Sequence, residues 1–254
     1  MTNYWKLVNE IIRDADILLL VIDSRYPEET RNLEIERKIQ QSDKKLIYVF
    51  NKCDLVGNDI SKEMQKKYPN SVFVSSKKRL GGTILFKKIL QLSEGKPCNV
   101  GVLGYPNVGK SSVVNLIRGK ESAGVSSQSG FTKGKQLIRA RNKIRLMDTP
   151  GVLPFGEKDR LKQLIIGAIN PQGLKNPELD IMKIIEAFPE MFEKYLGVKY
   201  SGDAFAYIEE VAIKKNILRK GGEPDTDRLS RQLLYDWQRG KLHEVLQKRN
   251  QPKA

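Results

Sequence analysis

A glycine-rich segment, GYPNVGKS at residues 104–111, has the residue types and spacing of a loop that binds phosphates. Its glycines allow the backbone to wrap around an oligophosphate, and consecutive N–H groups point at that ligand together with the N-terminus of the following helix. Lys110 would neutralise β- and γ-phosphate oxygens, and the Ser111 hydroxyl would bind Mg²⁺. The segment lies between an apolar run and a helical pattern, as this chemistry requires. The sequence therefore predicts a nucleotide site here.

Two later segments carry residues expected to complete the phosphate and metal site. In RLMDTPG, Asp148 ends an apolar run, where its carboxylate can hold a water of the Mg²⁺ shell, and the Gly151 N–H can meet a γ-phosphate. In the polar segment SGFTKGKQ, Thr132 is expected to supply a hydroxyl to Mg²⁺ and to sense the γ-phosphate. We expect Lys110, Thr132 and Gly151 to act in catalysis.

The segment NKCD, which ends in Asp54, contains a carboxylate suited to reading guanine. Asp54 can accept hydrogen bonds from the N1–H and N2–H₂ donors of guanine, and adenine lacks that pair of donors. The stem of Lys52 can lie over the ring, and Asn51 can tie two loops together. In VSSKK, the Ser76 N–H can meet guanine O6 while Lys77 covers the other face. The base predicted for this site is therefore guanine.

The expected site is larger than these few side chains, and its cofactors are GTP or GDP with Mg²⁺. We expect the nucleotide to be bound by Asn51, Lys52, Asp54, Ser75, Ser76, Lys77, Pro106, Asn107, Val108, Gly109, Lys110, Ser111, Ser112, Asp148 and Gly151. We expect the Mg²⁺ ligands to be Ser111, Thr132 and, through a water, Asp148.

The first 160 residues alternate between two periodicities. Amphipathic helical segments alternate with apolar runs such as ILLLVID and KLIYVFN, which suit parallel strands buried on both faces. This rhythm predicts a domain over residues 1–160, with a doubly wound, mostly parallel α/β sheet covered by helices. Because ligands bind at the carboxyl ends of strands in such sheets, the motifs that follow these runs are expected at one edge.

From about residue 161 onward, only helical patterns follow. Leu229, Leu233 and Trp237 recur at helical spacing and predict a buried face. We expect residues 161–254 to form a second, all-helical domain, with almost no linker before it. The single histidine, His243, is expected on the surface of the C-terminal tail and not in catalysis.

Charge and composition indicate the compartment and the kind of partner. The chain has 45 Lys and Arg against 30 Asp and Glu, a net charge of +15 that favours nucleic acid as a partner but also serves solubility. Two cysteines, no signal peptide and no long apolar run predict a cytoplasmic protein without a membrane partner. Without a base-reading pattern, RNA binding is expected to be backbone-dominated and steeply salt-dependent. The candidate RNA contacts are Lys214, Lys215, Arg219, Lys220, Arg228, Arg231 and Arg239.

The motifs NKCD, SSK, GYPNVGKS, SGFT and DTPG, in that order, resemble the circularly permuted GTPases of the ribosome-biogenesis type, the YlqF/YawG group. IDSRYPEETRN also resembles the D-A-R-x-P signature of that family, with Ser24 in place of Ala, and LSEGKP supplies the link that a permuted chain needs. The C-terminal segment resembles the small helical domain of the family, which is associated with ribosomal RNA. The resemblance implies a GTPase that acts in maturation of the large ribosomal subunit through rRNA. Separately, we expect the chain to be monomeric.

Two details bear on catalysis. Many GTPases have a water-orienting Gln directly after D-x-x-G, whereas this chain has Val152, so we expect slow intrinsic hydrolysis that ribosomal particles accelerate. Related GTPases with Asn at the position of Asn107 bind K⁺ there, although Asn also favours turns without any bound ion.

Three interpretations of the function stay open: a GTP-hydrolysing assembly factor, an RNA-binding module that uses GTP only as a conformational ligand, and an ATP-dependent kinase. The kinase reading leaves NKCD and SSK unexplained.

Overall fold

The computed structural model describes residues 3–119, 136–139, 144–148 and 159–249. The chain divides into two compact units, residues 1–157 and 158–254, and each is described by itself. Within the described ranges, no helix is both long enough and apolar enough to cross a membrane.

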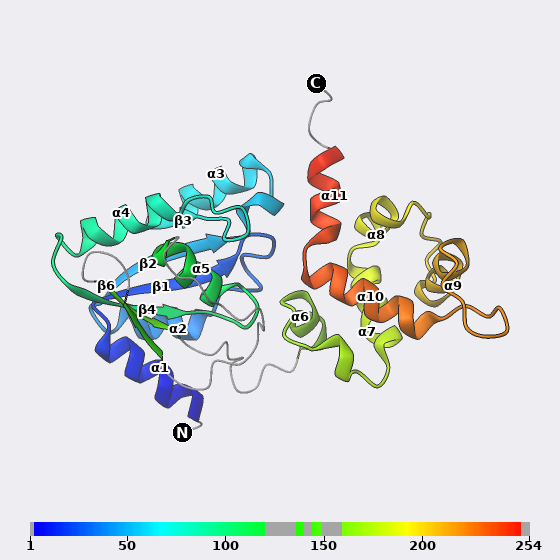
Figure 1. Ribbon diagram of the computed structural model, residues 1–254, viewed down its shortest axis with the longest axis horizontal. Coiled ribbons are helices and arrows are strands. Elements are labelled where there is room, and N and C mark those ends of the chain that lie inside the picture. Colours follow the sequence, from blue (N-terminus) through cyan, green and yellow to red (C-terminus); the bar gives the residue numbers. More distant parts are fainter. Residues whose placement is uncertain (1–2, 120–135, 140–143, 149–158, 250–254) are drawn as a thin grey trace. The chain divides into compact units, whose positions relative to one another are not determined.

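The first unit is built on one six-stranded sheet with the order β3-β2-β1-β4-β6-β5 (Figure 1). Its strands are β1 (Ile17–Asp23), β2 (Lys45–Asn51), β3 (Ser71–Phe73), β4 (Cys98–Leu103), β5 (Gln136–Arg139) and β6 (Ile144–Asp148). All neighbouring strands pair in parallel except β5, which runs antiparallel to β6 at one edge. The prediction of a doubly wound, mostly parallel sheet is confirmed.

The helices of this unit precede the first strand or lie between successive strands. They are α1 (Asn3–Asp14), α2 (Leu33–Gln40), the short 3₁₀ helix η1 (Cys53–Leu55), α3 (Asn58–Lys67), α4 (Gly82–Leu92) and α5 (Lys110–Arg118). Residues 93–97 join α4 to β4, and Gly95 within this link adopts a φ of +70°. A short turn thus connects the half of the unit that carries NKCD to the half that carries the glycine-rich loop.

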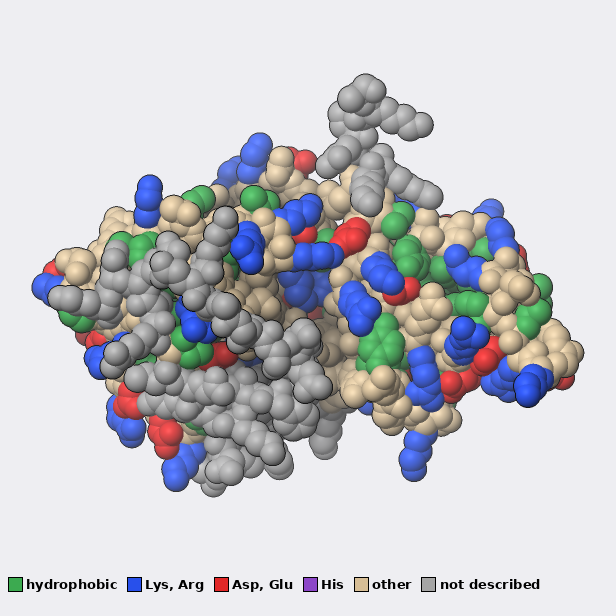
Figure 2. Space-filling model, viewed as in Figure 1, with side chains coloured by type: hydrophobic (Ala, Val, Ile, Leu, Met, Phe, Trp, Pro, Cys, Tyr) green, Lys and Arg blue, Asp and Glu red, His purple; other side chains and the backbone are tan. Residues whose placement is uncertain are grey.

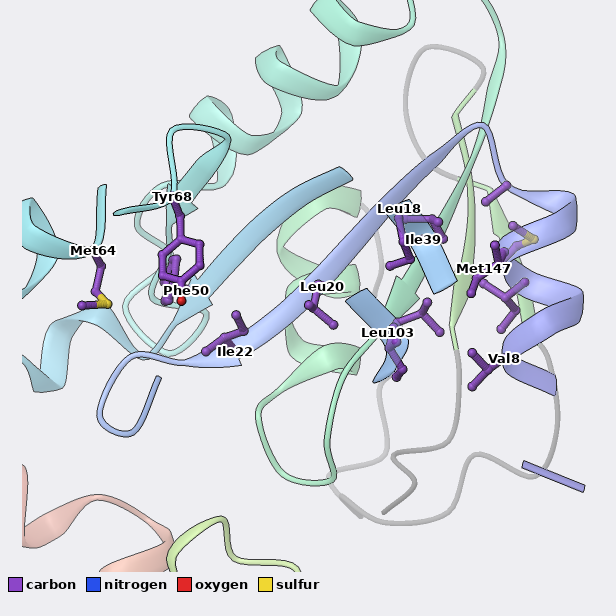
Figure 3. Packing of buried hydrophobic residues seen from close by; sticks show 14 residues of the cluster. Val8, Leu18, Leu20, Ile22, Ile39, Phe50, Met64, Tyr68, Leu103 and Met147 are labelled. Carbon is purple, nitrogen blue, oxygen red and sulfur yellow. The ribbon is translucent and has the colours of Figure 1, made fainter. Parts of the chain in front are cut away.

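Apolar side chains fix the helices against the sheet. Every residue of β1 is buried, as expected for a central strand between two parallel neighbours. Figure 3 shows part of the core, which extends from Met64 and Tyr68 beside β2 to Val8 on α1. At Gly101 in β4, an added Cβ would lie 2.6 Å from Ile11 of α1, so this helix packs directly on the backbone of the strand that leads to the glycine-rich loop.

The described residues of the second unit form helices and no strand. They are α6 (Arg160–Ile165), the 3₁₀ helix η2 (Pro171–Gly173), α7 (Pro177–Ala187), α8 (Pro189–Leu196), α9 (Ala204–Lys214), α10 (Thr226–Gln238) and α11 (Lys241–Arg249). Leu229, Leu233 and Trp237 of α10 are buried, as their spacing predicted. Trp237 stacks on Phe192 with a centroid distance of 6.0 Å. An aromatic contact therefore connects α8 to α10.

The expected position of His243 is wrong. Its exposed fraction is 9%, and its ring lies edge-on to Trp237 with a centroid distance of 5.9 Å. Gly240, with a φ of +77°, ends α10 and lets α11 fold back, so that Leu242 and His243 are buried. The histidine is a core residue of the helical unit.

Candidate nucleotide-binding site

The predicted motifs follow strands that end at the same edge of the sheet. In the parallel register, Asp23 at the end of β1 pairs with Asn51 at the end of β2, and Leu20 pairs with Leu103 at the end of β4. The glycine-rich loop therefore begins beside β1, between the strands that carry NKCD and Asp148. This arrangement matches the rule that ligands of open α/β sheets bind at the carboxyl ends of strands.

Two glycines of the loop are required by its backbone. Gly104 has a φ of +143°, and a Cβ there would lie 2.4 Å from the Val21 carbonyl oxygen. Gly109 has a φ of +94°, and a Cβ there would lie 2.2 Å from Asn51 Nδ2. Both positions combine a left-handed conformation with a close approach that a side chain would block. Asn107, with a φ of +59°, takes the left-handed region that Asn tolerates better than most residues.

Lys110 lies at the start of α5 with its side chain turned into the loop. It is 5% exposed, and its Nζ donates a hydrogen bond to the Tyr105 carbonyl at 2.8 Å. Burial lowers the pKa of Lys110 to about 8, although the charge of nearby Asp148 acts in the opposite direction. Asp148 is itself buried at the end of β6, whereas Ser111 is exposed in the first turn of α5. A cation and an anion thus approach the loop from two elements.

The lowered pKa of Lys110 predicts that nucleotide affinity depends on pH. A diphosphate binds the ammonium form, so affinity should be constant below about pH 8 and should fall by up to about tenfold per unit above it, because binding must then take up a proton. Titrations with fluorescent GDP from about pH 7 to about pH 9, a range in which guanine still largely keeps the N1–H that Asp54 is expected to read, would measure this dependence. The control is Lys110→Met, which should bind weakly with a flat profile, and an equal slope in this variant would contradict the assignment.

Asn51 connects the glycine-rich loop to the loop that follows β3. Its Nδ2 donates to the Val108 carbonyl at 2.9 Å. Its Oδ1 accepts from the Ser76 backbone N–H at 3.2 Å and from the Ser76 hydroxyl at 3.0 Å. One buried amide therefore sets the spacing between two loops whose contact residues, Ser76 and Val108, are 32 residues apart in the chain. A base oxygen that accepts from the Ser76 N–H would share or replace this contact.

Lys52 makes a second link to the glycine-rich loop. It adopts a φ of +62°, which carries its side chain across the ends of the strands. Its Nζ donates to the Asn107 carbonyl at 2.9 Å and to Asp23 Oδ2 at 2.7 Å. The backbone fixes one end of the Lys52 side chain, and the two hydrogen bonds of Nζ fix the other. The aliphatic stem between them therefore has a defined position, which a side chain must have if a base is to stack on it.

Asp54 is the candidate for reading the base, and its environment suits a buried acceptor. It lies in η1, and its side chain is only 4% exposed. The Nζ of Lys78 lies 4.0 Å from Asp54 Oδ2. Nearby, the Lys78 backbone N–H donates to Ser75 Oγ at 3.0 Å and closes the turn that displays Lys77 at the surface.

Sequence reasoning assigned no role to a buried ion cluster next to this site. Asp23 accepts from Arg25 Nε at 3.0 Å and from Arg25 Nη2 at 2.7 Å, in addition to its contact with Lys52. The side chains of Asp23 and Arg25 are 4% and 3% exposed. Burial alone would raise the pKa of Asp23, but the charges of Lys52 and Arg25 outweigh it and hold that pKa well below its usual range. The signal was present in IDSRYP, where an Asp ends a buried strand two residues before an Arg.

Other expected residues lie outside the described part of the chain. These are Thr132, Gly151 and Val152. The described residues contain no cluster of His, Cys, Asp and Glu that is able to hold a metal alone. Ser111 and Asp148 nevertheless fit Mg²⁺, because this ion uses few protein ligands and completes its shell with water and substrate phosphates.

The seven cations expected to contact RNA differ in their surroundings. Arg231 donates to the Asp227 carboxylate at 2.7 and 3.0 Å. It also donates to the carbonyls of Pro171 and Leu174 at 2.7 and 2.9 Å, and so connects α10 to the η2 segment. Lys214 donates to the Gly197 carbonyl at 2.8 Å. The remaining five are exposed: Lys215, Arg219, Lys220, Arg228 and Arg239. Of these, Arg219 forms an ion pair with Asp225 at 3.5 Å.

Comparison with known proteins finds similar sequences among GTP-binding proteins. Residues 99–187 match the family described as 50S ribosome-binding GTPase. An uncharacterized GTP-binding protein of Methanocaldococcus jannaschii is 42% identical over 246 residues, which cover 94% of this chain and 65% of that protein. Nucleolar GTP-binding protein 2 of Saccharomyces cerevisiae is 34% identical over 251 residues, which cover 94% of this chain and 52% of that protein. The chain thus spans about half to two thirds of the length of these relatives.

The fold has a counterpart among solved structures. GNP-bound YlqF from T. maritima is similar with a TM-score of 0.66 and 23% identity, over 93% of this chain and 94% of that chain. A GDP-bound YlqF structure is similar with the same TM-score and 24% identity, over 92% of this chain and 94% of that chain. The chain therefore has the fold of the YlqF structures, and its sequence is similar to 50S ribosome-binding GTPases over residues 99–187 and to nucleolar GTP-binding protein 2 over most of its length.

Proposed function

We propose that the chain binds GTP and GDP with Mg²⁺, hydrolyses GTP to GDP and phosphate, and acts as a nucleotide-switched assembly factor for the large ribosomal subunit through rRNA. The observation that carries this proposal is the position of Asn51, whose amide hydrogen-bonds the glycine-rich loop on one side and Ser76 on the other. A phosphate loop and a base-reading loop held at one spacing fit a nucleoside phosphate. The relatives, by their names GTP-binding or ribosome-binding, support the choice of ligand and partner.

Each group has a chemical role in this proposal. Backbone N–H groups of residues 107–110 and the Lys110 ammonium hold the phosphates, Asp54 accepts from guanine, and the stem of Lys52 supports the ring. Ser111 and, through a water, Asp148 would hold Mg²⁺, which neutralises charge on the phosphates. Asp23 and Arg25 act one step further away, because they fix the end of Lys52.

Phosphate release by the purified chain tests the enzymatic part. We expect slow turnover by the chain alone and multiple, faster turnovers when large ribosomal subunits are added, because no Gln follows DTPG to orient the water. Rates in K⁺ and in Na⁺ buffers test whether Asn107 helps to bind a catalytic monovalent cation. Lys110→Met serves as the inactive control.

A flat rate with and without ribosomal subunits favours the second candidate, an RNA-binding module that uses GTP only as a conformational ligand. Val152 keeps that candidate open, since valine cannot orient a water by hydrogen bonding. Competition by ADP as effective as that by GDP would contradict guanine recognition and revive the kinase reading.

A further inference from the structure

The positive charge of the chain is concentrated in the GTPase unit. Residues 1–157 contain 27 Lys and Arg against 16 Asp and Glu, whereas residues 158–254 contain 18 against 14. Of the net +15, the GTPase unit therefore carries +11 and the helical unit +4. Electrostatic attraction to a polyanion follows net charge and its local density, so the unit with most of the excess is the first place to look for RNA contacts.

Within the GTPase unit, one stretch stands out among the described residues. Residues 58–97 contain nine cations and three acids. They form α3, β3 and α4, and β3 is the edge strand of the sheet. Figure 1 shows these elements along one side of the unit, and Figure 2 shows Lys and Arg side chains over α3 and α4. We name this surface the basic edge; its cations are Lys62, Lys66, Lys67, Lys77, Lys78, Arg79, Lys87, Lys88 and Lys96.

The basic edge has the exposure that a phosphate-binding surface needs. Lys62, Lys66, Arg79 and Lys87 are exposed, and the side chain of Lys78 is 60% exposed. Ion pairs with acids engage Lys67, at 2.5 Å from Glu28, and Lys96, at 2.8 Å from Glu94. Exposed pairs of that kind contribute little and are readily exchanged for a phosphate partner.

Apolar side chains lie among these cations. Ile60, Leu80 and Ile84 are 44%, 53% and 63% exposed. Ile60 lies two residues before Lys62, Leu80 follows Arg79, and Ile84 lies one helical turn before Lys87 and Lys88. RNA offers sugar and base faces beside its phosphates, so a surface of mixed cationic and apolar side chains matches it better than it matches a purely ionic partner.

The basic edge also adjoins the candidate base site. The turn that displays Lys77, Lys78 and Arg79 begins at Ser76, which is hydrogen-bonded to Asn51. Lys78 lies between solvent and Asp54, at 4.0 Å from its carboxylate. A phosphate held by this turn would therefore lie next to residues expected to bind guanine.

We propose that the basic edge, and not the helical unit, is the principal surface with which this chain contacts the phosphate backbone of RNA. This inference rests on the proposed RNA-binding function and assigns it to α3, β3 and α4. Because the basic edge lies beside Ser76 and Asp54, a nucleotide bound by these residues can influence RNA binding through direct neighbours.

A pair of charge-matched variants tests the assignment. The edge variant is K62Q/K66Q/K87Q, and the control is K215Q/K220Q/R228Q, which removes three exposed cations from the helical unit. Neither variant touches a residue of the candidate nucleotide site. Affinity for a fluorescently labelled RNA hairpin is measured over a range of salt concentrations. GDP affinity confirms that the first unit is folded in each variant, and far-ultraviolet circular dichroism confirms that the helical unit is.

The edge variant should weaken RNA binding by at least about tenfold at low salt and reduce the slope of log K against log salt by about two, while the control changes both less. The assignment is overturned if the control loses as much affinity as the edge variant or more, or if the edge variant binds like the wild type. If the wild-type chain binds GDP but no RNA, the proposed RNA function fails and the basic edge fails with it. A loss of RNA affinity in the edge variant but not in the control supports both the proposed RNA binding and its assignment to the basic edge.

Discussion

Replacing Asp54 with Asn should lower the affinity for GDP by about a thousandfold and shift the preference toward xanthosine diphosphate. The Asp54 side chain is 4% exposed, so a guanine N1–H and N2–H₂ that lose their carboxylate acceptor find no water to replace it. An Asn side chain presents an N–H₂ donor to those donors, whereas xanthine has a carbonyl oxygen at position 2 that accepts from it. The Asp54→Asn substitution therefore disfavours guanine and favours xanthine.

Competition titrations with GDP, xanthosine diphosphate and ADP measure this switch. Asp59→Asn is the matched control, because Asp59 is an exposed acid in the first turn of α3 and should leave all three affinities unchanged. Unaltered GDP binding by the Asp54 variant would show that another group reads the base.

Replacing Arg25 with Met should destabilise the protein by about 3 kcal/mol and weaken GDP binding as well. Arg25 supplies two of the side-chain hydrogen bonds to the buried Asp23 carboxylate, which in turn holds the Nζ of Lys52 at 2.7 Å. Without Arg25, Asp23 loses its bidentate partner and the end of Lys52 loses a fixed acceptor.

Denaturant unfolding and GDP titration separate the two effects. Arg37→Met on the exposed face of α2 is the control and should cost less than about 0.5 kcal/mol. In a double-mutant cycle, Arg25 and Lys52 should couple by at least about 1 kcal/mol in GDP binding, because both act on Asp23. Independent effects in that cycle would reduce Arg25 to a purely structural residue.

The sheet and the edge that carries the site were predictable because their signals are local. A buried parallel strand reads as a continuous apolar run, and NKCD, the glycine-rich loop and Asp148 each follow such a run directly. Strand β5 and helices α8 and α11 were not among the predicted elements. β5 is four residues long and owes its conformation to pairing with β6, and α11 is held by packing around Trp237.

Contacts between distant segments were the part that sequence reasoning could not supply in full. Asn51 was expected to connect two loops. The hydrogen bond from the Ser76 N–H to its side-chain oxygen, however, depends on the register of β2 and β3. The position of His243 depends on how Gly240 turns the chain. The ion cluster of Asp23, Arg25 and Lys52 likewise joins the ends of two strands 29 residues apart, at a pairing that no single segment encodes.

The strand order has a consequence for how this chain is made. A ribosome releases β1, β2 and β3 before β4, so β1, which is central in the finished sheet, is first an edge strand whose side chains are apolar up to its final Asp23. In the nascent chain this edge stays open until residues 98–103 emerge, and only then does the glycine-rich loop reach Asn51. With this order of strands, we expect the most aggregation-prone moment of synthesis at the passage through residues 93–97, the link between the two halves of the first unit.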